Sequence, residues 1–218
     1  MTQAQTLAVL GLGTFGTALA RELARMGNRV VGLDLDDGRI QALHGDIDVV
    51  IQADATDTKV LDHAGLGSMD AAIVAIGDDM QASLLAAMAV QKTGVPRVMV
   101  KAQTPEHAQI LRAMGVANIL EPELAYAART AQLLNNPKLS DFLNLGNGNY
   151  VAAMRAPVAP ECKAVGDMKL ERFELACVGI DIGERILTRD LDAHPLAPSD
   201  TLLLAGKREA LRRFATQG

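Results

Sequence analysis

Aromatic residues are scarce in this 218-residue sequence: tryptophan is absent, and aromatic residues make up only 3% of the chain. Proteins that bind single-stranded nucleic acids commonly stack the bases on aromatic side chains. Basic residues are not in excess either, because 21 Lys and Arg stand against 26 Asp and Glu for a net charge of −5. Since phosphate backbones are bound by basic surfaces, we expect no nucleic-acid partner.

Cysteine is also scarce, with only Cys162 and Cys177 in the chain. Two cysteines do not suit the disulfide framework of a small secreted domain, and they form no zinc site without further ligands. We interpret both as small buried hydrophobes in a reducing compartment.

Long apolar segments are missing too. No run approaches the about 20 residues needed to cross a bilayer, and residues 1–5 lack the basic flank and apolar core of a signal peptide. The sequence therefore predicts a cytoplasmic protein that reaches a membrane only through a partner.

What the sequence does have, up to about Leu134, is a regular alternation of short apolar runs and longer amphipathic stretches. The runs suit parallel strands buried on both faces: residues 6–10, 29–34, 49–53, 71–76, 97–101 and 118–121. The clearest helices are residues 16–26, 78–92 and 105–114, and the glycines that follow them, Gly27, Gly94 and Gly115, are predicted C-terminal caps. The fold class is therefore α/β, a Rossmann-like doubly wound parallel sheet.

The pattern changes after Leu134, where Asn and Pro interrupt a helix and residues 144–149 are rich in turn formers. We predict a Rossmann-type nucleotide-binding domain over residues 1–135, a linker over 136–149 and a small α+β domain over 150–218. In the small domain we expect strands at 150–156, 176–182, 186–190 and 202–205, helices near 165–173 and 207–215, and a hairpin turn at 182–185.

The strongest local motif is Gly11-x-Gly13-x-x-Gly16, between the first strand and the first helix. Gly11 permits a tight turn, Gly13 lets a pyrophosphate approach the backbone, and Gly16 lets helix and strand pack closely. The helix N-terminus offers unpaired N–H groups to the anion. This turn is the predicted phosphate site.

Asp34 ends the second predicted strand, where a carboxylate accepts hydrogen bonds from ribose hydroxyls. The alternative is a cap of the next helix, a role that Asp36 or Asp37 also fits. Three carboxylates with no basic neighbour would repel a 2′-phosphate, so we expect NADP to bind poorly.

Two further strand ends supply candidates at the same edge of the sheet. After the third strand, Asp54 either meets the exocyclic amine of adenine or caps the helix starting near Asp57, and the two interpretations weigh equally. After the fourth, Gly77 leaves room for phosphates. Lys101 ends the fifth strand, where its ammonium either reaches a terminal phosphate or is simply solvated.

Glu123 stands in the first turn of the last Rossmann helix, directly after Pro122. A carboxylate there complements the helix dipole, and from the bare sequence we prefer that role to a cation site. The four histidines, His44, His63, His107 and His194, have no ligand spacing and are interpreted as non-catalytic.

Three motifs carry a family resemblance: Gly11-Leu12-Gly13-x-Phe15-Gly16, Val100-Lys101-Ala102-Gln103, and Met114-Gly115-Val116-x-x-Ile119 before Pro122-Glu123. With them the chain resembles, over almost its whole length, the cytosolic regulatory subunits of Trk/Ktr-type potassium transporters, known as RCK or KTN proteins. The small domain resembles the C-terminal regulatory domain of this family more loosely.

The resemblance implies homodimers that assemble into an octameric ring on the inner face of the cell membrane, beneath a membrane-embedded potassium transporter. ATP and ADP would compete for the Rossmann site, and some members bind NAD(H) there. Glu123 matches a residue that coordinates a divalent cation, and some relatives bind cyclic di-AMP in the C-terminal domain. The expected nucleotide site comprises Gly11, Gly13, Thr14, Phe15, Gly16, Asp34, Asp54, Ala55, Thr56, Ala75, Ile76, Gly77 and Lys101.

Thr14 departs from the family pattern, since close Ktr-type relatives carry there an Arg that meets the γ-phosphate. The resemblance nevertheless implies a regulatory protein and not an enzyme. The alternative is an NAD-dependent oxidoreductase with a minimal C-terminal domain, which would need an acid or base after Tyr150, where only His194 is available. A third hypothesis is a redox-sensing transcription factor of Rossmann type, but this sequence shows no DNA-binding element.

Overall fold

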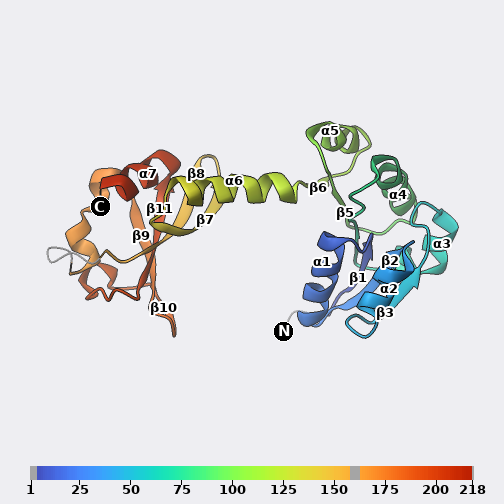
Figure 1. The fold of residues 1–218 in the computed structure, drawn as a ribbon, viewed down its shortest axis with the longest axis horizontal. Coiled ribbons are helices and arrows are strands. Elements are labelled where there is room, and N and C mark those ends of the chain that lie inside the picture. The colour runs from blue at the N-terminus through green and yellow to red at the C-terminus, as the bar shows by residue number, and fades with distance from the viewer. Residues whose placement is uncertain (1–3, 158–162, 218) are drawn as a thin grey trace. The chain divides into compact units, whose positions relative to one another are not determined.

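The computed structural model describes residues 4–157 and 163–217. The chain folds as two compact units, Met1–Glu123 and Leu124–Gly218, each with its own sheet (Figure 1). This division falls earlier than the boundary that the sequence suggests after residue 135.

The first unit contains a six-stranded sheet in the order β3-β2-β1-β4-β5-β6, with every pair parallel. All six strands lie where the apolar runs predict them, with ends that differ by at most two residues. Because the order reverses between β1 and β4, a crevice is expected at the carboxyl ends of these two strands. The strands are β1 (Thr6–Leu10), β2 (Arg29–Asp34), β3 (Val49–Gln52), β4 (Ala71–Val74), β5 (Val98–Lys101) and β6 (Asn118–Leu120).

Helices cover both faces of this sheet, and most begin at a capping side chain. Asp36, Asp57, Asp79 and Thr104 each accept a hydrogen bond from a backbone N–H in the first turn of the helix that follows. Gly27, Gly94 and Gly115 have positive φ and end their helices as predicted. The helices are α1 (Thr14–Arg25), α2 (Asp37–Leu43), α3 (Thr58–His63), α4 (Met80–Lys92) and α5 (Pro105–Ala113), with a 3-10 turn η1 (Leu66–Ser68).

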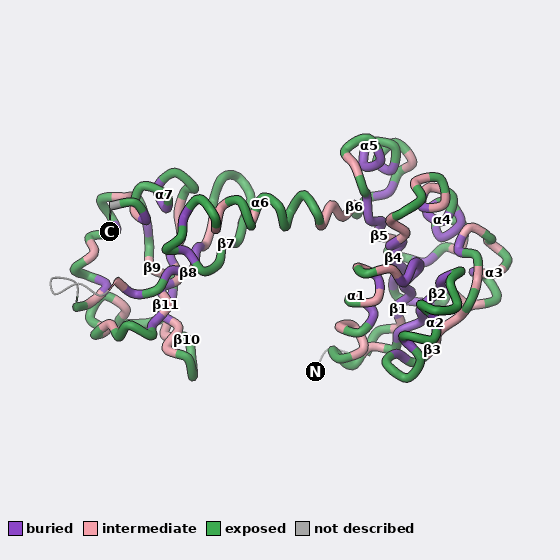
Figure 2. The backbone as a smooth tube through the Cα atoms, viewed as in Figure 1, coloured by how far each residue is buried: buried purple, intermediate pink, exposed green. Residues whose placement is uncertain are grey.

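The alternation of side chains along each strand builds two cores. In β1, Ala8 and Leu10 face the side that α3, α4 and α5 cover, while Val9 faces α1 and α2. The central strands β1, β2 and β4 are therefore buried on both faces, whereas the outer strands β3 and β6 are only partly buried (Figure 2).

The second unit contains an antiparallel sheet in the order β10-β9-β11-β8-β7, packed against α7. Its core includes the fully buried side chains of Ile180, Leu202 and Leu204. Its elements are α6 (Pro122–Asn135), which begins in the first unit, β7 (Leu139–Gly146), β8 (Asn149–Arg155), η2 (Val165–Met168), η3 (Leu170–Phe173), β9 (Ala176–Asp181), β10 (Ile186–Leu187), η4 (Leu191–Ala193), β11 (Thr201–Lys207) and α7 (Arg208–Gln217).

The predicted linker at 136–149 is corrected by the structure, because most of it forms β7, which pairs with β8. The strand escapes detection because its register shifts between Leu139 and Asp141 and again near Asn144. Leu139 and Phe142 both face the core at a spacing of three, which breaks the period of two that identifies a strand.

Two other expectations for the small domain are also modified. The helix expected at 165–173 is two short 3-10 turns, separated where Lys169 adopts φ 49°. The strand expected at 186–190 ends at Leu187, and Asp190 has φ 53°. The hairpin turn forms as predicted, since the Ile182 N–H donates to the Arg185 carbonyl at 3.1 Å. Cys177 is half-buried, and Cys162 lies outside the described residues.

Candidate nucleotide site

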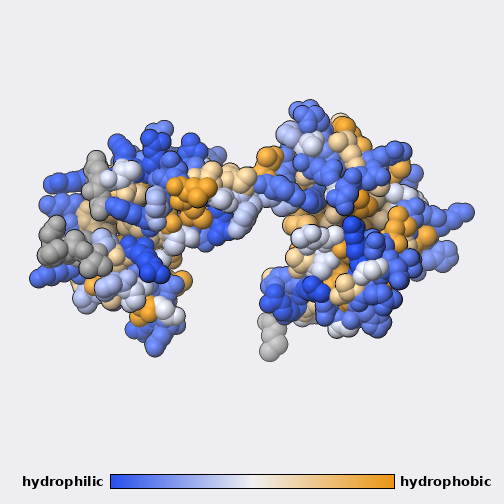
Figure 3. Space-filling model, in the orientation of Figure 1, coloured by the Kyte–Doolittle hydropathy of each residue, from blue (hydrophilic) through white to orange (hydrophobic). Residues whose placement is uncertain are grey.

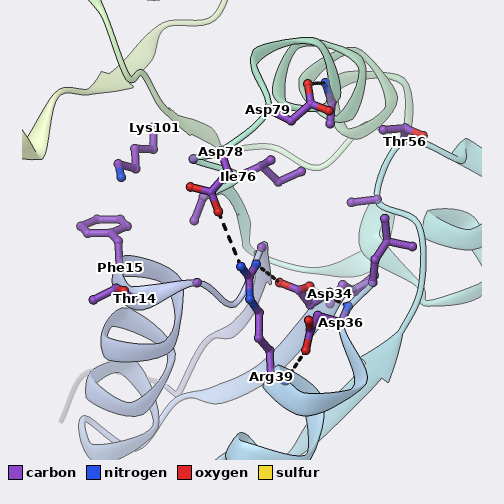
Figure 4. Close-up of a pocket in the computed structure, with 18 of the residues that line it drawn as sticks. Thr14, Phe15, Asp34, Asp36, Arg39, Thr56, Ile76, Asp78, Asp79 and Lys101 are labelled. Atoms are coloured by element: carbon purple, nitrogen blue, oxygen red, sulfur yellow. Dashed lines mark hydrogen bonds and ion pairs between the residues drawn. The ribbon is translucent and has the colours of Figure 1, made fainter.

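A cavity of about 570 Å³ lies at the carboxyl ends of the parallel strands. It opens at the point where the strand order reverses, which is the usual ligand position in this fold. Of the predicted site residues, only Gly16 does not line it. Those that do are Gly11, Gly13, Thr14, Phe15, Asp34, Asp54, Ala55, Thr56, Ala75, Ile76, Gly77, Lys101 and Glu123 (Figure 4).

Two of the three glycines of the turn, Gly11 and Gly16, have the spatial roles that the motif predicts. Gly11 has φ 94°, and a Cβ there would lie 2.8 Å from the backbone nitrogen of Ile76. A Cβ on Gly16 would lie 1.9 Å from the carbonyl oxygen of Gly11, so Gly16 allows α1 to pack on the turn from behind the cavity. Gly13 differs, because its Cβ would approach nothing closer than 3.9 Å.

Gly13 is also the N-cap of α1, and no side chain caps the helix. The first turn of α1 holds no acidic residue. Backbone N–H groups at the start of α1 thus face open space with the positive end of the helix dipole behind them. Such an arrangement has the chemistry that an anion such as a phosphate group requires.

Asp34 is buried at the end of β2 and anchors the glycine turn. Its Oδ2 accepts a hydrogen bond from the Leu12 N–H at 2.6 Å, and its Oδ1 accepts one from the Asp36 N–H at 2.9 Å. Asp36, not Asp34, caps α2. The carboxylate therefore couples β2 to the glycine turn, and Asp34 also lines the cavity.

Arg39 also lines the cavity although the sequence did not predict it, and it gives Asp34 the basic neighbour that we expected to be missing. Its Nη1 lies 3.3 Å from Oδ2 of Asp34, and its Nη2 lies 3.5 Å from Oδ2 of Asp78. The hydrogen bond from Arg39 to Asp34 and the charge of that carboxylate raise the pKa of the guanidinium. One signal was available: α2 starts at Asp37, so its first turn carries Arg39 back toward the end of β2.

Asp54 lines the cavity, and its side chain is hydrogen-bonded within the loop that follows β3. Its Oδ1 accepts hydrogen bonds from the Thr56 hydroxyl at 2.7 Å and from the Thr56 N–H at 2.8 Å. These bonds lower the pKa of the Asp54 carboxyl, the hydroxyl contributing most. The helix-capping interpretation of Asp54 is wrong, because Asp57 caps α3.

Lys101 and Glu123 form an ion pair at the edge of the cavity, with Nζ 2.6 Å from Oε1. Lys101 is buried, so the solvated interpretation of this lysine is wrong. Its Nζ also lies 5.6 Å from the centre of the Phe15 ring (Figure 4). The hydrogen bond from Lys101 is the main cause that lowers the pKa of the Glu123 carboxyl.

A divalent cation at Glu123 finds few ligands in one chain. Among residues 4–157 and 163–217, no three His, Cys, Asp or Glu side chains lie together so as to hold a metal. The one carboxylate at this position is already compensated by the Lys101 ammonium. The residues of a single chain therefore do not fit a cation site.

The histidines lie elsewhere. None of the four lines the cavity. His107 is fully buried at the start of α5, where Nδ1 accepts a hydrogen bond from the Gln103 N–H at 3.3 Å. His194 lies in the second unit, with Nε2 3.3 Å from Oδ2 of Asp200.

A doubly wound sheet with an uncapped helix above a glycine turn and a carboxylate ending β2 defines a Rossmann-type nucleotide-binding domain. The chain belongs to the TrkA-N domain family, whose model matches residues 7–122, more than half of the sequence. In the described part of the chain, no helix is long and apolar enough to span a membrane.

Two curated relatives match both units. The chain is 28% identical over 208 residues to the Ktr system potassium uptake protein C of Bacillus subtilis (strain 168), covering 95% of this chain and 94% of that protein. It is also 28% identical over 205 residues to the Ktr system potassium uptake protein A of Vibrio alginolyticus, covering 94% and 93%.

Solved structures share the fold over nearly the whole chain. The GsuK RCK domain matches with a TM-score of 0.64 and 17% identity, covering 96% of this chain and 46% of that chain. The GsuK channel bound to NAD matches with a TM-score of 0.63 and 17% identity, covering 96% and 38%. The architecture is therefore that of an RCK domain.

Proposed function

We propose that this chain is a nucleotide-sensing regulatory subunit of a membrane potassium transporter, working on the inner face of the cell membrane. The observation that carries this proposal is the end-to-end similarity to Ktr potassium uptake proteins, which spans both units and leaves little of either protein unmatched. The transporter we propose is the membrane subunit of a Ktr- or Trk-type potassium uptake system.

The ligand we propose is an adenine nucleotide, with ATP and ADP competing for the cavity and NAD as an alternative occupant. The α1 N-terminus would receive the phosphates, and Lys101 and Arg39 supply the only cationic side chains among the described lining residues. Asp34 offers acceptors to the ribose, and Asp54 lies where the base would be read. The NAD-bound state of GsuK supports the NAD alternative.

The nucleotide would act through differential affinity for two states of a ring built from homodimers into an octamer. A ligand shifts such an equilibrium only as far as its affinities for the two states differ. Support for assembly comes from α6, which has no fully buried residue. Leu134, Leu143 and Leu145 are also exposed on α6 and β7, where Figure 3 shows hydrophobic atoms at the surface.

We also propose the small unit as the place for cyclic di-AMP or a similar anionic nucleotide. A second cavity of about 440 Å³ there is lined by Lys169, Arg172 and Arg213 together with Met168 and Phe173. Three cations beside an aromatic ring suit a phosphorylated base.

The rival function is an NAD-dependent oxidoreductase. Proton transfer in such an enzyme is usually performed by a His, Lys, Tyr or carboxylate that faces the reacting atoms. No His, Tyr or Cys lines the first cavity in the described chain, and its lysine is paired with Glu123. The other carboxylates that line it are already engaged by N–H, hydroxyl or guanidinium groups. The regulatory function is therefore favoured.

Small-angle scattering and absorbance together test the proposed function. Exchanging ADP for ATP should change the scattering profile of the assembled protein, while the 340 nm absorbance of added NADH should stay constant. Identical profiles with both nucleotides, or steady consumption of NADH, would contradict the regulatory function.

A further inference from the structure

The Arg39 side chain crosses the mouth of the first cavity from α2 (Figure 4). It connects two carboxylates from different parts of the chain: Asp34, at the end of β2, and Asp78, in the loop between β4 and α4. With 43% of its side chain exposed, Arg39 is open to an incoming ligand.

The two carboxylates hold Arg39 very unequally. The Asp34 side chain is 7% exposed and is fixed by two backbone N–H groups. The Asp78 side chain is 91% exposed, and within the described residues the ion pair to Arg39 is its one polar contact. Since ion pairs of exposed side chains are weak, the Asp78 end of the bridge is easily exchanged.

The guanidinium also lies beside the phosphate turn. A Cβ on Gly13 would be 3.9 Å from Nη1 of Arg39, with no other heavy atom that near outside its chain neighbours. A phosphate group bound at the N-terminus of α1 would therefore arrive next to Arg39. A phosphate offers the guanidinium the same kind of charged oxygen acceptor that Asp78 offers, with more charge.

We infer that Asp78 is a built-in competitor of the nucleotide phosphates for Arg39. In the ligand-free chain Asp78 holds Nη2, and on binding a phosphate group takes its place while Nη1 remains on Asp34. The inference rests on the proposed nucleotide function of this cavity and adds to it two residues that set the affinity. Adenosine, which has no phosphate, gains nothing from the exchange.

The raised pKa of Arg39 fits this arrangement, because the hydrogen bond and charge of Asp34, with smaller contributions from Asp36 and Asp78, keep the guanidinium charged. The cation is therefore present at every physiological pH, and only its partner changes.

Calorimetric titration of adenosine and ADP into the wild type, Asp78→Asn, Arg39→Met and the double variant tests the inference. Asp78→Asn should tighten ADP binding by about threefold to tenfold, and Arg39→Met should weaken it by about tenfold, as expected for loss of a charge-assisted hydrogen bond. Adenosine affinity should change by less than about twofold in all variants. In the double variant, the gain from Asp78→Asn should disappear.

Arg21→Met and Asp46→Asn are the matched controls, because they break an exposed Arg–Asp pair of the same unit, outside the cavity, with the same changes of charge. Both should leave ADP affinity unchanged. If ADP binds the wild type but Asp78→Asn does not tighten it, or tightens it equally without Arg39, the inference is wrong and the proposed function stands. If no adenine nucleotide binds the wild type, the proposed function fails, and the inference fails with it.

Discussion

Nζ of Lys101 lies 2.6 Å from Oε1 of Glu123, so the buried cation at the end of β5 and the first carboxylate of α6 neutralise one another. The pair takes up the positive charge that lies over the Phe15 ring. Two consequences follow for phosphate binding, one for Lys101 and one for divalent cations.

Replacing Glu123 with Gln should tighten ATP binding, because Lys101 then loses its internal partner and can pair with a terminal phosphate. We expect a gain of about threefold to tenfold in affinity, a range typical of a charged hydrogen bond made in partly exposed surroundings. Titration calorimetry measures it, and Glu121→Gln, which breaks the pair with Arg112, is the control.

The same titration, repeated with a chelator, tests whether ATP binding depends on a divalent cation. Because Lys101 compensates Glu123, the ATP-to-ADP preference of the wild type should be unchanged when Mg²⁺ and Ca²⁺ are removed. A preference that vanishes with the chelator would mean that Glu123 holds a cation in the assembled protein.

Gly13 should tolerate a small side chain but not a charged one. A Cβ there has open space in the protein, so Gly13→Ala should fold normally, but the methyl group takes part of the space that a phosphate needs and should weaken binding by less than Gly13→Asp does. Gly13→Asp places a negative charge where the phosphates approach, and affinity should fall at least about tenfold, or about 1.4 kcal/mol. If a folded Gly13→Asp protein binds nucleotide with the affinity of the wild type, the glycine turn does not bind the phosphates.

Much of this site was predictable because glycine roles follow from backbone sterics. Gly11 adopts a positive φ, and at Gly16 a Cβ would clash with a carbonyl oxygen. The spacing of the motif predicts both requirements for glycine. Parallel strands that are buried on both faces are likewise predictable, because they appear in the sequence as apolar runs. The role of Arg39 could not be predicted in the same way. It depends on how α2 is placed next to the end of β2, where Asp34 lies, and the pattern within a single element does not show this.

Local irregularity explains the errors in the second unit. The bulges of β7 destroy its alternation, so a paired strand has the sequence pattern of a linker. The left-handed conformations of Lys169, Glu174 and Asp190 occur at residues other than glycine, and sequence alone does not mark them.

His107 predicts a pH dependence of stability. Burial lowers the pKa of this histidine below its ordinary value of 6.5. The unfolded chain therefore binds more protons, and the free energy of unfolding should fall as the pH drops from 6.5 toward the lowered value. Above about pH 7.5 the contribution should be constant.

Urea unfolding at pH 7.5 and 5.5 measures this effect. His107→Leu should lose part of the difference between the two pH values, whereas His44→Asn, at an exposed position after α2, should retain it. An unchanged pH difference in His107→Leu would assign the acid sensitivity to other groups.

Assembly should depend on the exposed apolar residues of α6. Leu134 is 79% exposed in the single chain, so Leu134→Asn should spare the fold of a monomer while weakening contact with a second copy. Light scattering should give an octamer for the wild type and smaller species for Leu134→Asn. Met26→Asn, which changes another exposed apolar side chain directly after α1, is the control. A wild type that stays monomeric at micromolar concentration would contradict the ring.

We propose that ATP and ADP bind one and the same cavity, the one that Gly13 lines. A displacement titration tests it most directly: the protein is saturated with ADP, ATP is added in a calorimeter, and the experiment is repeated with Gly13→Asp. We predict one site per chain, full displacement of ADP by ATP, and loss of both signals in the variant. Independent binding of the two nucleotides, or binding that survives in Gly13→Asp, would contradict the account.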